Sequence, residues 1–142
     1  MTATTSALPA QETGRELVAA LRRAGIADVD DSGLARALYS SDASLYRVLP
    51  RAVVRPRHTD EIVAALDVCR SLGVPLTARG AGTSIAGNAV GPGVVVDTSR
   101  HLHRVLRIDP EARTATVEPG LVQAALQTAA RPHGLRFGPD PS

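Results

Sequence analysis

The sequence predicts an α+β fold, in which a small parallel sheet is followed by an antiparallel hairpin and a helix. Three patterns carry this prediction: a strand, helix and strand over residues 52–78, a glycine-rich loop over 80–93 that leads into three valines, and alternating apolar and polar residues on both sides of a turn at 109–112. A helix between two short strands is the usual connection of a parallel pair, whereas a short turn joins an antiparallel pair.

Length and composition limit the classes of protein that fit. The 142 residues suffice for one hydrophobic core and are few for two ordinary domains, and 44% apolar with 21% charged residues is typical of a chain that folds. A net charge of +2, with two Tyr, one Phe and no Trp, disfavours nucleic-acid binding. The sequence starts without a secretory signal pattern and has no apolar run that could cross a membrane, so we expect a cytoplasmic protein.

Residues 1–48 are expected to form a helical segment ahead of the main domain. Apolar residues at helical spacing predict a helix over 11–24 that Gly25 ends. A shorter helix should begin near Ser32, whose hydroxyl can cap it. Tyr46 lies in the polar stretch that follows, and we expect it to pack against the protein rather than bind a ligand.

The helix of the strand, helix and strand unit has a recognisable start and an apolar stripe. Thr59 is the expected N-cap, and the acidic residues after it suit the positive end of the helix dipole. Ile62, Leu66 and Cys69 recur at helical spacing, which predicts that the single cysteine is buried on that stripe. The unit should deliver the next loop to the carboxyl end of the sheet, where open α/β sheets bind ligands.

The glycine-rich loop has the chemistry of an anion site. Glycines disfavour a helix and leave backbone N–H groups accessible, so that several can converge on one anion. The register fits neither common phosphate loop. Ile85 stands where the dinucleotide fingerprint needs its third glycine, and Asn88 and Ala89 stand where a nucleoside-triphosphate loop has lysine and a hydroxyl residue. These residues predict a diphosphate cradle, with a structureless surface loop as the alternative.

The last third of the chain should contain a hairpin over residues 105–118 and a helix over 121–130 that Gly134 ends. His101 and His103 precede the hairpin and could share a face of a strand, as two metal ligands would. A third ligand is not indicated, so we expect solvated or hydrogen-bonded histidines and no metal site.

Several motifs resemble one flavoprotein family. They are Arg79-Gly80-Ala81-Gly82-Thr83-Ser84 with Gly87-Asn88, Val94-Val95-Val96-Asp97-Thr98-Ser99, Ile108-Asp109-Pro110, Thr116-Val117-Glu118-Pro119-Gly120, Pro132-His133-Gly134-Leu135 and Gly138-Pro139-Asp140-Pro141-Ser142. Together they resemble the FAD-binding domain of proteins related to p-cresol methylhydroxylase (PCMH) and vanillyl-alcohol oxidase. The branch is that of the glycolate oxidase FAD subunit, D-lactate dehydrogenases and D-2-hydroxyglutarate dehydrogenases. Ala81 and Asn88 depart from it, since glycine and glutamine are common there.

The resemblance implies that residues 49–142 are the first part of a PCMH-type FAD-binding domain, truncated before a second glycine-rich segment and a substrate domain. It implies no catalytic residue in this chain. It places the following residues at the cofactor: Arg79, Gly80, Ala81, Gly82, Thr83, Ser84, Gly87 and Asn88 at the diphosphate, and Pro139, Asp140, Pro141 and Ser142 along the flavin. Arg79 could instead pair with Asp97 or another neighbour.

The resemblance also implies an activity for a complete enzyme. A D-2-hydroxy acid of the lactate, glycolate or 2-hydroxyglutarate type would lose a hydride to flavin N5, and electrons would pass to a quinone, a partner subunit or another acceptor, through which the protein could sit at a membrane. No histidine lies between Arg79 and Gly93 for the covalent attachment known in some relatives, so FAD should bind non-covalently. The alternatives are a flavin-binding or interaction module without activity, and a reductase of the same flavin fold.

Overall fold

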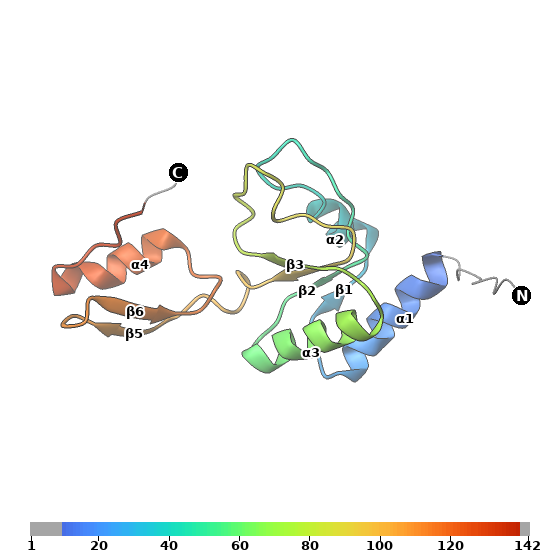
Figure 1. Ribbon diagram of the computed structural model, residues 1–142, viewed down its shortest axis with the longest axis horizontal. Helices are drawn as coiled ribbons and strands as arrows, with labels where there is room; N and C mark the ends of the chain where they lie inside the picture. The colour runs from blue at the N-terminus through green and yellow to red at the C-terminus, as the bar shows by residue number, and fades with distance from the viewer. Residues whose placement is uncertain (1–9, 140–142) are drawn as a thin grey trace, which may run out of the picture.

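The larger part of the molecule is built on a four-stranded sheet with the order β1-β2-β4-β3 (Figure 1). The structure is a computed structural model and describes residues 10–139. Strands β2 (Ala52–Val54), β3 (Leu76–Arg79) and β4 (Val94–Asp97) are parallel, and β1 (Val29–Asp30) is antiparallel to β2 at one edge. The predicted parallel crossover is therefore present, with β4 inserted between its two strands, whereas β1 was not predicted.

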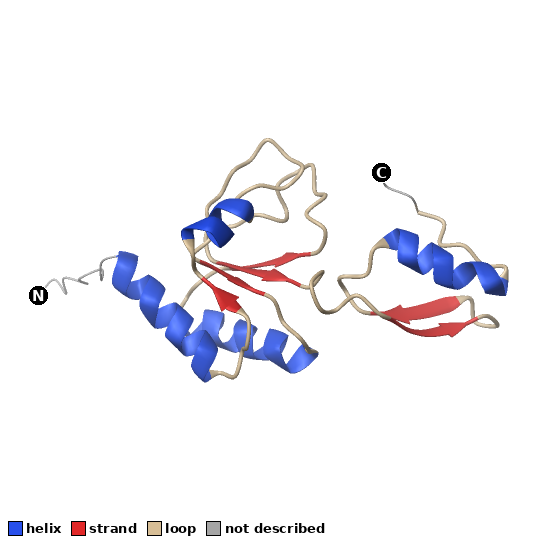
Figure 2. Ribbon diagram, turned by 180° about the vertical axis from the view of Figure 1, so that it is seen from behind, coloured by secondary structure: helices blue, strands red, loops and turns tan. Residues whose placement is uncertain are grey.

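Helices cover both faces of this sheet. α1 (Ala10–Arg23) and α3 (Thr59–Ser71) pack on one face, while α2 (Gly33–Leu38) lies on the other beside long loops (Figure 1). Figure 2 shows the same layers from behind. The hydroxyl of Ser32 accepts the N–H of Ala35 and caps α2, as predicted.

The two faces are filled by alternate residues of the strands. Val54 and Val96 join the core beneath α1 and α3, whereas Val53 and Val95, which are equally buried, point to the opposite face. Burying each such side chain stabilises the fold by roughly 1.5–3 kcal/mol. Both faces of the central strands are therefore dry, which is why the valine run is continuous rather than alternating.

The start of α3 differs from the prediction by one residue. His58 occupies the N-cap position without a side-chain cap bond, and Thr59 is the first helical residue. The prediction of Thr59 as the cap was therefore wrong, and a buried carboxylate organises the approach to the helix instead. Glu61 accepts the N–H groups of Arg57 at 2.8 Å and Ala27 at 3.3 Å. It thereby satisfies donors ahead of the helix and ties α3 to the segment after α1.

The buried face of α3 is also rotated from the predicted stripe. Glu61, Ala65 and Cys69 are buried, whereas Leu66 is 49% exposed. Cys69 lies in the core as predicted, and burial raises the pKa of its thiol. Small side chains at positions 65 and 69 allow the helix to lie close to the sheet, so the bulkier Leu66 is left at the rim.

A smaller lobe follows the sheet. β5 (Val105–Asp109) and β6 (Thr114–Val117) form the predicted hairpin, and α4 (Gln123–Ala130) lies beside it (Figure 1). The short 3-10 helix η1 (Arg131–His133) ends at Gly134, which has the left-handed φ of 67° that the sequence predicted for a helix stop. Within residues 10–139, no helix is both long and apolar enough to cross a membrane.

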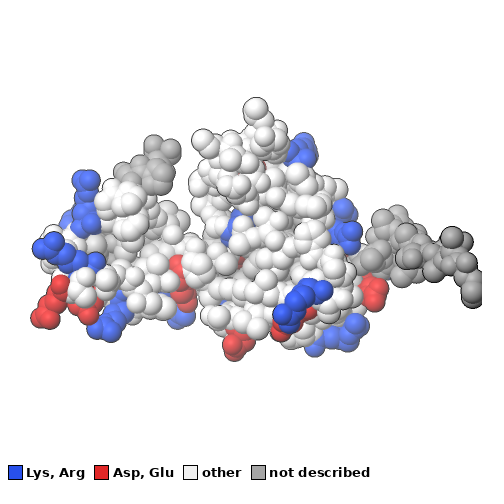
Figure 3. Space-filling view, viewed as in Figure 1, with Lys and Arg blue, Asp and Glu red and all other residues white. Residues whose placement is uncertain are grey.

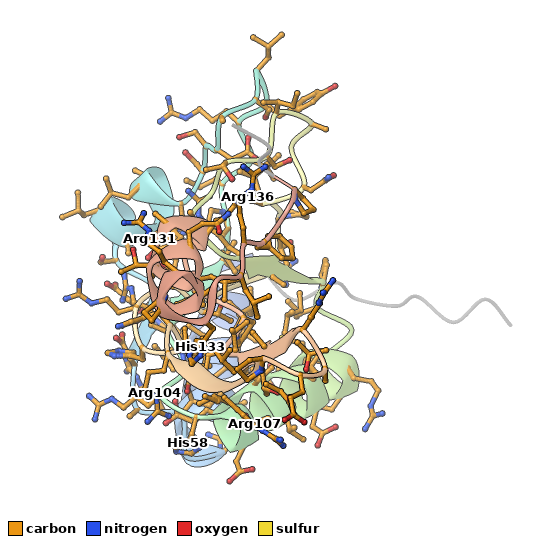
Figure 4. All side chains as sticks on the ribbon, turned by 90° about the vertical axis from the view of Figure 1, so that its left-hand side faces the viewer. His58, Arg104, Arg107, Arg131, His133 and Arg136 are labelled. Carbon is orange, nitrogen blue, oxygen red and sulfur yellow. The ribbon has the colours of Figure 1, made fainter. Side chains whose placement is uncertain are left out.

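The two lobes are joined by chain segments that hold each other. Gly120 N donates to Leu102 O at 2.8 Å, and Glu118 N donates to Arg104 O at 2.9 Å. The Glu118 carboxylate is buried and accepts from the backbone N–H and the guanidinium of Arg104, both at 2.7 Å. Figure 4 looks onto the smaller lobe, with Arg104 at its lower side. The connection therefore consists of two chain segments that are hydrogen-bonded to each other rather than of one isolated linker.

Gly93 tests the packing where the chain enters β4. A Cβ at this position would overlap the carbonyl oxygen of Pro75, whereas a Cβ at Gly14 in α1 would meet nothing within 4 Å. We expect Gly93→Ala to lower the free energy of unfolding by about 2 kcal/mol. Gly14→Ala should raise it by about 0.5–1 kcal/mol because alanine is the better helix former. Urea unfolding of both variants measures this, and equal effects would contradict the packing described.

Glu118 tests the connection between the lobes. Hydrogen bonds from Arg104 hold the pKa of the Glu118 carboxyl below its ordinary value. The pair therefore contributes stability that is present at neutral pH and is lost as the pH falls below the ordinary pKa of a glutamate side chain. We expect Glu118→Gln to melt below the wild type at pH 7 and the gap to close on acidification. A gap that is independent of pH would contradict this.

Candidate functional site

The glycine-rich loop, residues 80–93, is itself a crossover between neighbouring strands. β3 and β4 are adjacent and parallel, so the loop must leave the carboxyl end of β3 and return to the amino end of β4. It forms neither helix nor strand. Figure 1 shows it arching over the sheet on the side away from α1 and α3. The loop thus begins at the carboxyl edge of the sheet, as the sequence predicted.

The start of this loop presents unpaired backbone donors. Within the described part of the chain, the N–H groups of residues 80–85 and of Gly87 have no hydrogen-bond partner. Gly82 and Gly87 have φ values of 72° and 78°, which other residues rarely adopt. Ala81 has no positive φ and is exposed, so its methyl group is accommodated by ordinary backbone geometry. Successive free N–H groups in an irregular turn are the arrangement that binds anions.

Ser84 closes the loop on itself. Its Oγ accepts the N–H of Ala86 at 3.2 Å and the N–H of Asn88 at 3.1 Å. A hydroxyl has two acceptor lone pairs and one proton, so these two bonds leave the proton of Ser84 available as a donor. The second bond joins the two ends of the stretch 84–88. The N–H of Asn88 is thereby used within the protein.

A second segment, residues 41–46, is joined to the loop by two hydrogen bonds. Ala43 N donates to Gly82 O at 3.1 Å, and Ala89 N donates to Asp42 Oδ2 at 3.2 Å. Hydrogen bonds from Ser44 and Ala89, with the nearby charge of Arg79, hold the pKa of Asp42 below its ordinary value.

Sequence reasoning missed the support that this segment gives. Tyr46 packs its ring against Gly87, as its predicted packing role requires. The only local sign was the spacing of Asp42 and Ser44, which suits a side chain that bonds the backbone two residues on.

Arg79 is turned into the protein. Its Nη1 donates to Ser41 O at 2.9 Å and to Ala89 O at 3.1 Å, and its guanidinium lies 5.2 Å from the centre of the Tyr39 ring. Arg79 pairs in register with Asp97, yet that carboxylate accepts from the Tyr39 hydroxyl at 2.5 Å instead. In the described structure Arg79 therefore contacts Ser41, Ala89 and Tyr39 rather than the Asp97 carboxylate.

The loop is electrically neutral on its surface. Residues 80–93 contain no Lys, Arg, Asp or Glu, and Figure 3 shows that the top of the larger lobe is almost free of charged side chains. On the smaller lobe the labelled Arg107, Arg131 and Arg136 point in different directions rather than toward one place (Figure 4). The backbone of the glycine-rich loop, rather than a cluster of cations, is therefore the feature suited to bind an anion.

The other candidate residues lie apart from this loop. Pro139 is exposed, and its carbonyl oxygen accepts from Gln123 Nε2 at 2.6 Å. Asp140, Pro141 and Ser142 lie outside the described residues. His103 Nδ1 lies 3.1 Å from Ser99 O, as expected of a hydrogen-bonded histidine. Residues 10–139 contain no group of three His, Cys, Asp or Glu side chains that could hold a metal ion.

Comparison with known families and proteins finds similar sequences over most of the chain. The model of a family described as FAD binding domain matches residues 50–142. The glycolate oxidase subunit GlcD of Bacillus subtilis is 40% identical over 120 residues, which are 83% of this chain and 26% of that protein. The D-2-hydroxyglutarate dehydrogenase of Pseudomonas putida is 36% identical over 129 residues, which are 88% of this chain and 13% of that protein.

Solved structures show the same fold at low sequence identity. A substrate-bound p-cresol methylhydroxylase matches with a TM-score of 0.74 and 20% identity, over 88% of this chain and 26% of that one. An alkyldihydroxyacetonephosphate synthase matches with a TM-score of 0.72 and 23% identity, over 97% and 28%. The chain thus spans about a quarter of these proteins and of the Bacillus relative.

Proposed function

We propose, from the premise that this chain belongs to the FAD binding domain family, that residues 80–88 hold the diphosphate of FAD. The observation that carries the proposal is the row of backbone N–H groups over residues 80–85 without a partner in the described structure. A diphosphate has many acceptor oxygens and no donor, so it complements such a row. The loop and the cofactor therefore fit.

The hydroxyls of Thr83 and Ser84 would add two donors to this site. Ser84 can donate its proton because both of its lone pairs are occupied by Ala86 and Asn88. Gly87 would add one more free N–H group. These contacts would hold the cofactor's phosphates, while its ring system lies elsewhere.

We propose that Pro139, Asp140, Pro141 and Ser142 border the flavin, and that residues 1–48 form a segment ahead of the cofactor domain at 49–142. The support for the first is the resemblance of the motif from Gly138 onward. The division at residue 48 rests on the family match, which begins at residue 50. It is a division of the sequence only, since the core contains residues from both parts.

The relatives by sequence are FAD-linked oxidoreductases of hydroxy acids, and we propose the same class for the whole protein. When bound, FAD would supply the redox chemistry by accepting a hydride at N5 from the α-carbon of a D-2-hydroxy acid. The residues of this chain would position the cofactor, and none of them is assigned a catalytic role. We also propose that the protein is located in the cytoplasm and that its electron acceptor is a quinone or a partner subunit, as the sequence predicts.

Gly80 allows a direct test of the diphosphate site. A Cβ at this position meets nothing within 4 Å, so a side chain can be added there. Gly80→Asp and Gly80→Asn add nearly the same volume and differ in charge. We expect the wild-type chain to bind FAD and Gly80→Asp to weaken binding about tenfold more than Gly80→Asn, since like charges close together repel. Titration with FAD by calorimetry measures this. Equal affinities for the two variants, or no binding to the wild type, would refute the proposal.

The mode of attachment is tested separately. We propose non-covalent FAD because the loop contains no histidine. After the FAD-loaded chain is denatured and filtered, all flavin absorbance should appear in the filtrate. Flavin that stays with the unfolded chain would contradict non-covalent binding.

A further inference from the structure

We infer that Arg79 is a positioning residue, which sets the shape of the glycine-rich loop from inside the protein and does not touch the diphosphate. The inference rests on the proposed function in one respect, namely that the shape of the loop matters because the loop binds FAD. Its physical basis is independent of any cofactor, because every contact that defines it lies within the chain.

The first step is the closure of the loop at its base. Arg79 precedes the loop, and its Nη1 binds the carbonyl of Ala89 near the other end at 3.1 Å. The same nitrogen binds the carbonyl of Ser41 at 2.9 Å, from the supporting segment. Hydrogen bonds from a cation to carbonyl oxygens are stronger than neutral ones, so one side chain joins three pieces of chain.

The second step is the position of Arg79 itself. Two guanidinium groups lie over the Tyr39 ring, with ring centre to Cζ distances of 5.2 Å for Arg79 and 5.4 Å for Arg55. The Tyr39 hydroxyl donates to Asp97 at the end of β4 and accepts from Arg55 Nε at 3.3 Å. Burial and the Asp97 carboxylate raise the pKa of Tyr39, so the phenol keeps its proton. The hydrogen bond to Asp97 therefore fixes Tyr39 on the sheet, and the contact with the Tyr39 ring positions the Arg79 guanidinium.

The third step concerns Gly82, the second glycine of the motif. A Cβ at Gly82 would collide with the guanidinium of Arg79. The missing side chain therefore makes room for Arg79 beneath the loop. This places a positive charge behind an otherwise uncharged backbone, where it favours an anion on the outer side through its field.

The test compares three variants of the 142-residue chain by hydrogen–deuterium exchange without FAD and by FAD titration. Arg79→Met keeps the length of the side chain and removes its charge and donors. Arg79→Lys keeps the charge but cannot span both carbonyls. Arg70→Met is the control, because Arg70 is exposed on α3 and, among residues 10–139, its side chain pairs only with Asp67.

We expect Arg79→Met to accelerate exchange of the hydrogen-bonded amides in residues 41–46 and 80–90 of the free chain, to leave exchange in β2 and β4 unchanged, and to weaken FAD binding about tenfold. Those amides are the N–H groups of residues 43, 44, 46, 86, 88 and 89. Arg79→Lys should lie between Arg79→Met and the wild type in both measurements, and it carries the test if the methionine variant does not fold. Arg70→Met should match the wild type.

The outcomes separate the inference from the proposed function. Weaker FAD binding with unchanged exchange in the free chain would make Arg79 a direct phosphate ligand and overturn the inference. Unchanged exchange and unchanged affinity would overturn it as well. Faster exchange confined to the two segments, in a chain whose wild type does not bind FAD, would support the positioning role and refute only the proposed cofactor site.

Discussion

Two adjacent parallel strands joined without a helix are the constraint on which the rest of this structure depends. A chain that leaves the carboxyl end of β3 must cross the sheet before it can enter β4. A helix would satisfy its own backbone donors on the way. The glycine-rich loop does not, and it lies over a face that Val53 and Val95 make apolar. The N–H groups of residues 80–85 and of Gly87 have no partner within the described residues, so they are available to a ligand.

A loop with few internal hydrogen bonds needs support from elsewhere to keep one shape. Here the support comes from residues 41–46 and from Arg79, and Arg79 is linked to the sheet through Tyr39 and Asp97. The two glycines with left-handed φ serve this arrangement differently, since Gly82 lies against Arg79 and Gly87 against Tyr46. Each of these two positions thus needs glycine for two reasons, because its backbone has a left-handed φ and because a neighbouring side chain occupies the place of a Cβ.

The shared fold has a limited meaning for chemistry. Proteins as different as a p-cresol methylhydroxylase and an alkyldihydroxyacetonephosphate synthase match this chain at TM-scores of 0.74 and 0.72. A fold shared by proteins with such different names does not by itself identify an activity or a substrate. The proposed hydroxy-acid class therefore rests on the relatives by sequence and not on the shared fold.

The sequence by itself determined the elements that depend on local chemistry: the valine strands, the hairpin at 105–118, the cap at Ser32 and the non-helical glycine-rich loop. It misplaced the buried face of α3, because neighbouring positions of a helix carry similar apolar residues and only packing on the sheet selects among them. It could not show that β4 lies between β2 and β3, nor that Arg79 turns inward to carbonyls 38 and 10 residues away in sequence. Those contacts join distant parts of the chain, so they exist only once the sheet has brought these parts together.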